Sequence, residues 1–428
     1  MSPSSTRWSG ERNNCGIIQM SKKVLIHSLV FNPDGVSTAY LYGDIASSLK
    51  NAGYEVVVLT TTPHYNKVES QLKCQPLRWV IPGFLKKSSF RGITVYHVPQ
   101  RKFKSTSLRL VGFVYWHLVS FITALCVKKV DVILSPSPPL TIGMLNVWLG
   151  KLKGAKVVYN VQEVYPDILG KESGVVFNVL SRIEHYIYNK SSAVTTIDAI
   201  FYDTIKGRFI DQKKLHIIPN FVDTELYRPI ALTPRLDKSV FIPNDNLKLL
   251  YAGNIGMAQD WNTLIELAKI TRSCKIDYYV IGEGMMREYV KEVIGKYDLS
   301  NIHLLPYQPR ELMPEIIGFS DIQFIFMEPQ IAAQGFPSKV YTIMASAKPL
   351  LVCSPENTPI VNFLNDIGCA KIVTLTDPEK KAEAIARWLE TVTREELHRM
   401  GLAGNREIVQ RYSKEIVTRQ YCDLLQSL

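Results

Sequence analysis

Two glycine-containing segments suit the binding of a phosphate-bearing ligand. Gly253, Asn254 and Gly256 follow a strand-like run and precede a helix-like one. Glycines at such a turn let backbone N–H groups approach a phosphate, although a purely structural turn needs glycine as well. Gly282 lies in a similar turn, Val280-Ile281-Gly282-Glu283-Gly284, where a structural and a ligand-facing role are both open. These segments predict a phosphate site.

Gln162 and Glu163 follow another strand-like run, 156–160. Gln162 can position a hydroxyl group without proton transfer, whereas the Glu163 carboxylate could accept a proton. Both residues are therefore catalytic candidates. The alternative for Glu163 is that it caps the following turn.

The first strand-like run, 23–30, leads into a polar loop that contains Asp34, Gly35, Ser37 and Thr38. Loops that follow the strands of an open α/β sheet face its ligand cleft. We therefore expect these four residues to contact a substrate.

The elements that position these residues alternate between strand and helix patterns. A βαβ opening reaches residue 60, and further strands are expected at 93–98, 130–135, 156–160, 193–197 and 215–218. After a polar, proline-containing linker the pattern restarts, with strands at 248–253, 277–281, 302–305, 322–326 and 350–353. The predicted fold class is α/β, with two tandem Rossmann-like domains that face a cleft.

The chain has 428 residues, of which 46% are hydrophobic, enough to bury two ordinary cores. We expect residues 1–20 to be a disordered extension, 21–230 the N-terminal domain and 231–405 the C-terminal domain. Residues 406–428 have amphipathic spacing and are expected to form one C-terminal helix that crosses back to the N-terminal domain.

The seven cysteines form no CxxC pair, which argues against a zinc site and a disulfide framework and favours the reducing cytoplasm. The extension has no apolar run of the kind a signal peptide needs. No acidic pair stands in a metal-binding context, so we expect no metal and no other cofactor.

One stretch of the sequence is strongly basic. It contains no Asp or Glu and carries Lys73, Arg78, Lys86, Lys87, Arg91, Arg101, Lys102, Lys104, Arg109, Lys128 and Lys129. Apolar residues are interleaved, so residues 73–129 predict a surface that meets an anionic membrane. An ordinary solvated face is the alternative. Nucleic acid is not expected as a partner, because no nucleic-acid motif accompanies the charge.

Residues 110–127 form an uncharged run just long enough to cross a membrane. His117, Ser120 and Thr123 weaken that reading, and a buried strand is expected directly after the run. We therefore favour a core or in-plane helix over a spanning one.

Six ordered features together resemble the retaining glycosyltransferases of the two-Rossmann-domain B-type fold, close to family 4. They are Pro33-Asp34-Gly35-Val36-Ser37-Thr38, Thr62-Pro63-His64-Tyr65-Asn66, Val161-Gln162-Glu163-Val164-Tyr165-Pro166-Asp167, Ile218-Pro219-Asn220-Phe221-Val222-Asp223, Tyr251-Ala252-Gly253-Asn254-Ile255-Gly256 and the segment from Gln334 to Ala345. Within that family the chain is similar to the bacterial capsule and exopolysaccharide branch that includes fucosamine- and fucose-type transferases.

The resemblance implies a donor site in the C-terminal domain. The family's sugar and ribose contacts are two Glu residues eight positions apart, where this chain has Gln334 and Thr342. The family also has a basic residue where Met257 stands, so Lys339 becomes the candidate that neutralises the donor diphosphate. The other implied donor contacts are Gly253, Asn254, Gly256, Gly282, Tyr307, Gly335, Phe336 and Ser338.

The implied acceptor site lies in the N-terminal domain, with Asp34, Gly35, Ser37, Thr38 and His64. The implied activity is transfer of a hexose or amino-deoxyhexose, with retention, from a UDP- or GDP-linked sugar to a lipid-linked glycan. The enzyme would work in the cytoplasm, peripherally on the inner face of the membrane. Two alternatives stay open: a nucleotide-sugar epimerase of the same fold, and a catalytically weak scaffold of a polysaccharide assembly complex.

Overall fold

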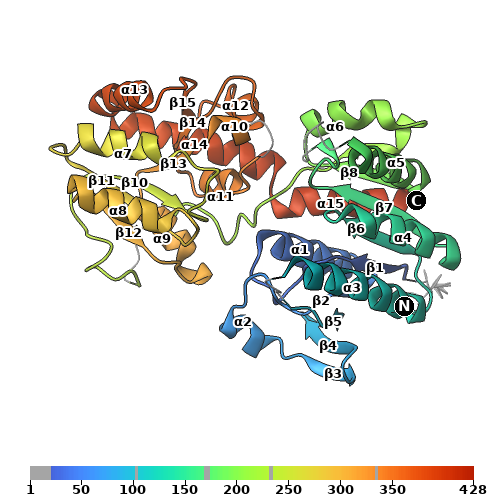
Figure 1. Ribbon diagram of the computed structural model, residues 1–428. Helices are drawn as coiled ribbons and strands as arrows, with labels where there is room; N and C mark the ends of the chain where they lie inside the picture. The colour runs from blue at the N-terminus through green and yellow to red at the C-terminus, as the bar shows by residue number, and fades with distance from the viewer. Residues whose placement is uncertain (1–20, 102–104, 168–173, 231–234, 333–335) are drawn as a thin grey trace, which may run out of the picture.

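The computed structural model describes residues 21–101, 105–167, 174–230, 235–332 and 336–428 (Figure 1). These residues form two α/β domains, each built on a twisted, mostly parallel sheet, which confirms the predicted fold class. The expected extension 1–20, the domain boundary at 230 and the candidates Gln334 and Gly335 lie outside the described residues or at their edge.

The N-terminal sheet has the order β3-β4-β5-β2-β1-β6-β7-β8-β9, and only the pairs β3–β4 and β4–β5 are antiparallel. Its strands are β1 (Lys23–His27), β2 (Glu55–Thr61), β3 (Arg78–Ile81), β4 (Leu85–Phe90), β5 (Ile93–Val98), β6 (Val132–Pro136), β7 (Lys156–Val161), β8 (Ala193–Thr196) and β9 (Leu215–Ile217). Its helices are α1 (Ser37–Asn51), α2 (Glu69–Cys74), α3 (Thr106–Cys126), α4 (Leu140–Lys153), α5 (Gly174–Lys190) and α6 (Ala199–Ile205), with short 3-10 turns at Lys206–Arg208 and Gln212–Lys214.

Alternate residues of each N-terminal strand point to opposite faces of the sheet, so the domain has two cores. Leu25 of β1 packs with Trp116 and Ile187 beneath α3, α4 and α5. Its neighbour Ile26 packs on the other face with Tyr42 of α1 and Tyr421 near the C-terminus.

The C-terminal sheet is entirely parallel, in the order β12-β11-β10-β13-β14-β15. Its strands are β10 (Leu247–Ala252), β11 (Ile276–Ile281), β12 (Ile302–Leu305), β13 (Ile322–Phe326), β14 (Leu350–Cys353) and β15 (Ala370–Val373). The helices are α7 (Trp261–Ile270), α8 (Arg287–Tyr297), α9 (Met313–Phe319), α10 (Pro329–Ala332), α11 (Lys339–Ala345), α12 (Pro359–Leu364), α13 (Pro378–Thr391), α14 (Arg394–Arg411) and α15 (Lys414–Ser427), with a 3-10 turn at Arg310–Leu312.

The C-terminal segment crosses back to the N-terminal domain as expected, where α15 packs against α1 (Figure 1). The expectation of one helix over 406–428 was wrong, because the chain breaks between α14 and α15. At the break Val222 donates its N–H to the Tyr412 carbonyl, and Lys414 donates its N–H to the Val222 carbonyl. A strand-like contact with the linker therefore replaces the helical hydrogen bonds at this point.

The basic stretch contains a β3–β4 hairpin that the sequence patterns did not reveal. In the following helix, α3, the fully buried residues are Trp116, Ser120 and Ala124, and Val119 and Phe121 are partly buried against the same core. It is long and apolar enough to cross a membrane by length and composition, and 22% of its most apolar window is buried. Its inward residues belong to the core under the sheet, so α3 lies along the surface of the domain.

Candidate functional site

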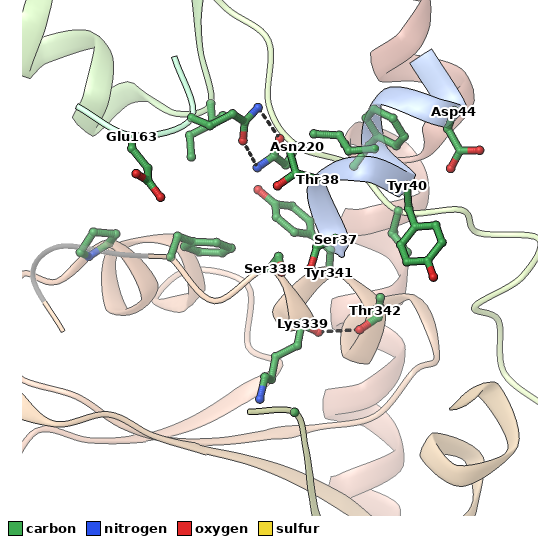
Figure 2. A pocket seen from close by; sticks show the side chains of 18 of the residues that line it. Ser37, Thr38, Tyr40, Asp44, Glu163, Asn220, Ser338, Lys339, Tyr341 and Thr342 are labelled. Carbon is green, nitrogen blue, oxygen red and sulfur yellow. Dashed lines mark hydrogen bonds between the residues drawn. The ribbon is translucent and has the colours of Figure 1, made fainter. Parts of the chain in front are cut away.

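A cleft of about 890 Å³ lies between the two domains and brings together most of the described candidate residues. Figure 2 shows the first turn of α1, with Ser37 and Thr38, close to the first turn of α11, with Ser338 and Lys339. The other candidates that line the cleft are Gly35, Gln162, Glu163, Gly253, Asn254, Phe336 and Thr342.

Lys339 is the first residue of α11 and is half-buried overall. Its ammonium lies 3.6 Å from the ring centroid of Tyr251. A Cβ atom added to Gly253 would stand only 2.7 Å from the Lys339 Nζ, so glycine makes room for the ammonium. Within the described residues, Lys339 has no ion pair with a carboxylate. Although carboxylates such as Glu163 and Asp44 also line the cleft, none of the described ones pairs with this ammonium.

Burial lowers the pKa of Lys339 from 10.5 to about 7. Removing an ammonium from water without a counter-charge disfavours its charged form. An anionic ligand in the cleft would raise the pKa of Lys339 again, so that its amine binds a proton. Lys339 thus fits a diphosphate contact, and a lone buried lysine of this kind often marks a functional site.

Thr342 lies one helical turn after Lys339, and its hydroxyl donates to the Lys339 carbonyl at 2.8 Å (Figure 2). The hydroxyl oxygen still has lone pairs for a ligand's O–H group. Phe336 lines the same wall and contacts the Tyr341 ring, with centroids 5.4 Å apart. This wall offers one charged donor, one acceptor and an apolar surface.

The glycine-rich turn does not form the open phosphate cradle that the sequence suggests. The N–H groups of Gly253, Ile255 and Gly256 donate to Ile281 O, Glu283 O and Gln259 Oε1, respectively. Helix α7 begins only at Trp261, so its N-terminus is not at the turn. Gly253 and Asn254 line the cleft, but Gly256 does not.

Gly282 also lies outside the residues that line the cleft, and the structure favours the structural alternative for it. A Cβ atom at Gly282 would stand 1.8 Å from the Gly253 carbonyl oxygen. Glycine therefore lets the loops after β10 and β11 touch. Tyr307, one of the implied donor contacts, is 58% exposed and does not line the cleft.

Gln162 forms a reciprocal amide pair with Asn220 across the cleft floor, at 3.1 Å and 3.0 Å (Figure 2). Its Nε2 also donates to Asn160 Oδ1 at 2.7 Å. Asn160 in turn donates to Thr195 and to the hydroxyl of Tyr421 in α15. The Gln162 amide is thus held by the protein, so it acts on a ligand mainly by fixing the position of its neighbours.

Glu163 lines the cleft and is half-buried. Burial raises the pKa of its carboxyl group, and a hydrogen bond with Tyr165 partly opposes that rise. Among the described residues, no backbone N–H group of the following turn donates to its carboxylate, so the turn-cap alternative is not supported. Its position in the cleft allows the carboxyl group to accept a proton or a hydrogen bond from a ligand hydroxyl group.

The structure assigns Asp34 a role other than the expected acceptor contact. Asp34 is buried, and its carboxylate accepts the backbone N–H groups of His64, Tyr65 and Asn66 at 2.8–3.0 Å. Its oxygens are thus occupied in shaping the loop after β2. His64 contacts Thr61 and Thr62 and does not line the cleft either.

Arg310 and Asp44 also line the cleft, although the sequence patterns did not predict them as site residues. The Arg310 guanidinium of the C-terminal domain lies 3.3 Å from the ring centroid of Tyr40 in α1. This cation–π contact joins the domains at the cleft edge. Asp44 lines the cleft near Arg91 and Lys414, and burial raises the pKa of its carboxyl group. No motif signalled them, because their contacts join distant segments.

Among the described residues, no group of three or more His, Cys, Asp or Glu side chains could hold a metal ion. The absence of a required metal stays a prediction.

Comparison with known protein families identifies the class to which the chain belongs. Residues 38–220 match the family described as "Glycosyl transferase 4-like domain". Residues 233–406 match the family described as "Glycosyl transferases group 1". The two matches together span most of the chain, which belongs to the glycosyltransferases made of these two domains.

Two curated relatives agree with this family. The chain is 22% identical over 336 residues to WcaI of Escherichia coli, named as a glycosyl transferase of colanic acid biosynthesis, covering 76% of this chain and 81% of WcaI. It is also 22% identical over 309 residues to WbjE of Pseudomonas aeruginosa, named as a glycosyltransferase, covering 70% of this chain and 76% of WbjE.

Solved structures share the fold. The structure of the Anabaena protein HepE in complex with UDP superimposes with a TM-score of 0.69 at 13% sequence identity. The superposition covers 95% of this chain and 100% of HepE. A glycosyltransferase from Rickettsia africae gives a TM-score of 0.68 at 15% identity, over 95% of this chain and 98% of its own.

Proposed function

We propose that the protein transfers a sugar, with retention of anomeric configuration, from a nucleoside diphosphate sugar to a lipid-linked glycan or polysaccharide precursor. The observation that carries this proposal is the unpaired Lys339 ammonium in the interdomain cleft. The names of WcaI and of the UDP complex of HepE support the substrate classes. We further propose that the reaction takes place in the cytoplasm, at the inner face of the membrane.

The donor would lie against the C-terminal wall of the cleft. Lys339 would contact the diphosphate, because a charged donor stabilises a phosphate oxygen more strongly than a neutral one. Thr342 would accept a ribose hydroxyl in place of the glutamate of related proteins. UDP and GDP donors both satisfy these contacts, which do not read the base.

The chemical step breaks the bond between the anomeric carbon and the diphosphate oxygen and forms a bond from the same carbon to the acceptor oxygen. In the proposed front-face reaction, the acceptor proton passes to the departing phosphate. Lys339 then stabilises the negative charge that develops on the leaving group. Ser37 and Thr38, across the cleft, would position the acceptor hydroxyl group.

The test is a panel of UDP- and GDP-sugars incubated with the purified protein, with and without a membrane extract. Transfer predicts release of free nucleoside diphosphate only when the extract is present. An epimerase would convert the donor without the extract. A scaffold would release nothing from any donor, and that result would remove both enzymatic readings.

Retention has its own readout. The one-bond and vicinal couplings of the product's anomeric proton report its configuration. The same configuration in product and donor supports the proposed chemistry, whereas an inverted product would contradict it.

A further inference from the structure

Three neighbouring elements of the N-terminal domain carry apolar side chains that the described residues leave exposed to solvent. The exposed apolar side chains of α3 include Leu110, Val111, Val114, Leu118, Ile122 and Leu125, with exposed fractions of 40–64%. They lie on the face opposite the buried Trp116, Ser120 and Ala124. One face of the helix is therefore apolar and exposed to solvent.

The β3–β4 hairpin extends this surface. Its exposed side chains are Trp79, Val80, Ile81 and Phe84, each 50–54% exposed. The Tyr115 hydroxyl of α3 donates to the Gly83 carbonyl at 2.9 Å, and the rings of Tyr115 and Phe84 lie 6.4 Å apart. The hairpin tip is thus fixed to α3.

Helix α4 is the third element that contributes exposed apolar side chains to this surface. Lys153 of α4 donates to the Leu125 and Val127 carbonyls at the end of α3, at 2.9 Å and 2.6 Å. Trp148 and Leu152 of α4 are 44% and 67% exposed. We call the exposed residues of these three elements the α3 surface.

Positive charge accompanies the α3 surface. No Asp or Glu occurs from residue 73 to 129 or within α4. Lys87, Lys128 and Lys151 are exposed beside it, and the Lys86 ammonium lies 4.4 Å from the Trp79 ring centroid. An apolar face with basic residues and interfacial tryptophan complements an anionic lipid leaflet. A second copy of the chain would instead bring two basic surfaces together.

We propose that the α3 surface binds an anionic membrane leaflet, with α3 lying in the plane of the membrane and the hairpin tip inserted beside it. A spanning orientation would pull Trp116 and Ala124 out of the core beneath the sheet. This inference rests on the proposed function, since it names the surface on which the enzyme meets a lipid-linked acceptor.

The test is sedimentation with vesicles of phosphatidylcholine, with and without about one third phosphatidylglycerol. The full chain binds the anionic vesicles, and added salt weakens that binding. Leu118→Gln with Ile122→Gln lowers the partition coefficient by about tenfold or more, because two half-exposed apolar side chains lose their transfer into lipid. Lys87→Gln with Lys128→Gln lowers the preference for anionic vesicles.

The matched control is Leu375→Gln with Leu402→Gln, at positions 44% and 39% exposed in the C-terminal domain. It leaves vesicle binding unchanged. Trp79 also gives a site-specific readout, because lipids brominated in their acyl chains quench its fluorescence, and Trp79→Phe removes that part of the quenching.

Three results would overturn the inference. They are equal vesicle binding by the Leu118/Ile122 variant and its control, a lipid-free dimer that the same variant dissociates, and retention of the protein in membranes after alkaline carbonate extraction. Donor binding, measured without lipid, checks that each variant is folded. Donor turnover, measured alongside vesicle binding, separates the two proposals. Intact turnover without vesicle binding refutes only the membrane surface, and vesicle binding without turnover refutes only the transferase.

Discussion

The unpaired Lys339 makes a quantitative prediction about pH. Its pKa in the free protein is about 7, lowered by burial from 10.5, so about nine tenths of the molecules carry the ammonium at pH 6 and about one tenth at pH 8. A diphosphate binds the charged form and raises this pKa again. The affinity for a nucleotide sugar should therefore fall as the pH rises through 7, by about tenfold between pH 6 and pH 8.

Isothermal titration calorimetry measures this change. A nucleotide sugar is the better ligand, because a free nucleoside diphosphate has a terminal phosphate that titrates near pH 6. Titrations at pH 8 in buffers of different ionisation enthalpy should show uptake of close to one proton per donor bound. Uptake should disappear at pH 6, where Lys339 is already charged.

Two substitutions separate Lys339 from other groups that titrate in this range, such as Glu184, whose pKa burial raises to about 7 in a neighbouring cavity. Lys339→Arg keeps a permanent charge, so the pH dependence should flatten. Lys339→Met should weaken donor binding at pH 6 by about 10- to 150-fold, the range of a lost charged hydrogen bond. Wild-type affinity that is flat from pH 6 to 8, without proton uptake, would refute the reasoning.

Three further predictions follow from individual contacts. Thr342→Val should weaken donor binding by about tenfold through the lost acceptor, and calorimetry with ribo- and deoxyribo-donors should show that only the wild type distinguishes them; equal discrimination by both proteins would exclude the ribose contact. Gly282→Ala should lower the free energy of unfolding by about 2–4 kcal/mol because of the 1.8 Å approach to Gly253 O, whereas Gly295→Ala in α8, with nothing within 4 Å, should be neutral or stabilising in urea denaturation. Glu163→Gln should reduce the turnover number by less than about tenfold if the leaving phosphate takes the proton, and a loss of 10²-fold or more would make Glu163 the general base.

Local patterns predicted those parts of the fold that depend on local spacing. The strands around Leu25, Val58 and Tyr279 are buried on both faces and give uninterrupted apolar runs. The hairpin at Trp79 was missed because every residue of β3 is exposed, so this strand shows no alternation of apolar and polar residues. The break at Tyr412 was missed because Val222, far away in the sequence, supplies its hydrogen bonds.

In the candidate site too, the sequence predicted individual residues but not the contacts that distant segments make with them. The sequence indicated Lys339, but not that Tyr251 and Gly253 would surround its ammonium. It indicated Asp34 as a polar loop residue, although three backbone N–H groups take its oxygens. Arg310 meets Tyr40 only because the domains come together.

The most direct test of the central claim is acceptor-dependent release of nucleoside diphosphate by the wild type and two lysine variants in one membrane extract. If Lys339 stabilises the leaving diphosphate, Lys339→Met abolishes release at pH 7, while Lys380→Ala, at an exposed lysine of the same domain, retains it. Unchanged release by Lys339→Met would contradict the account.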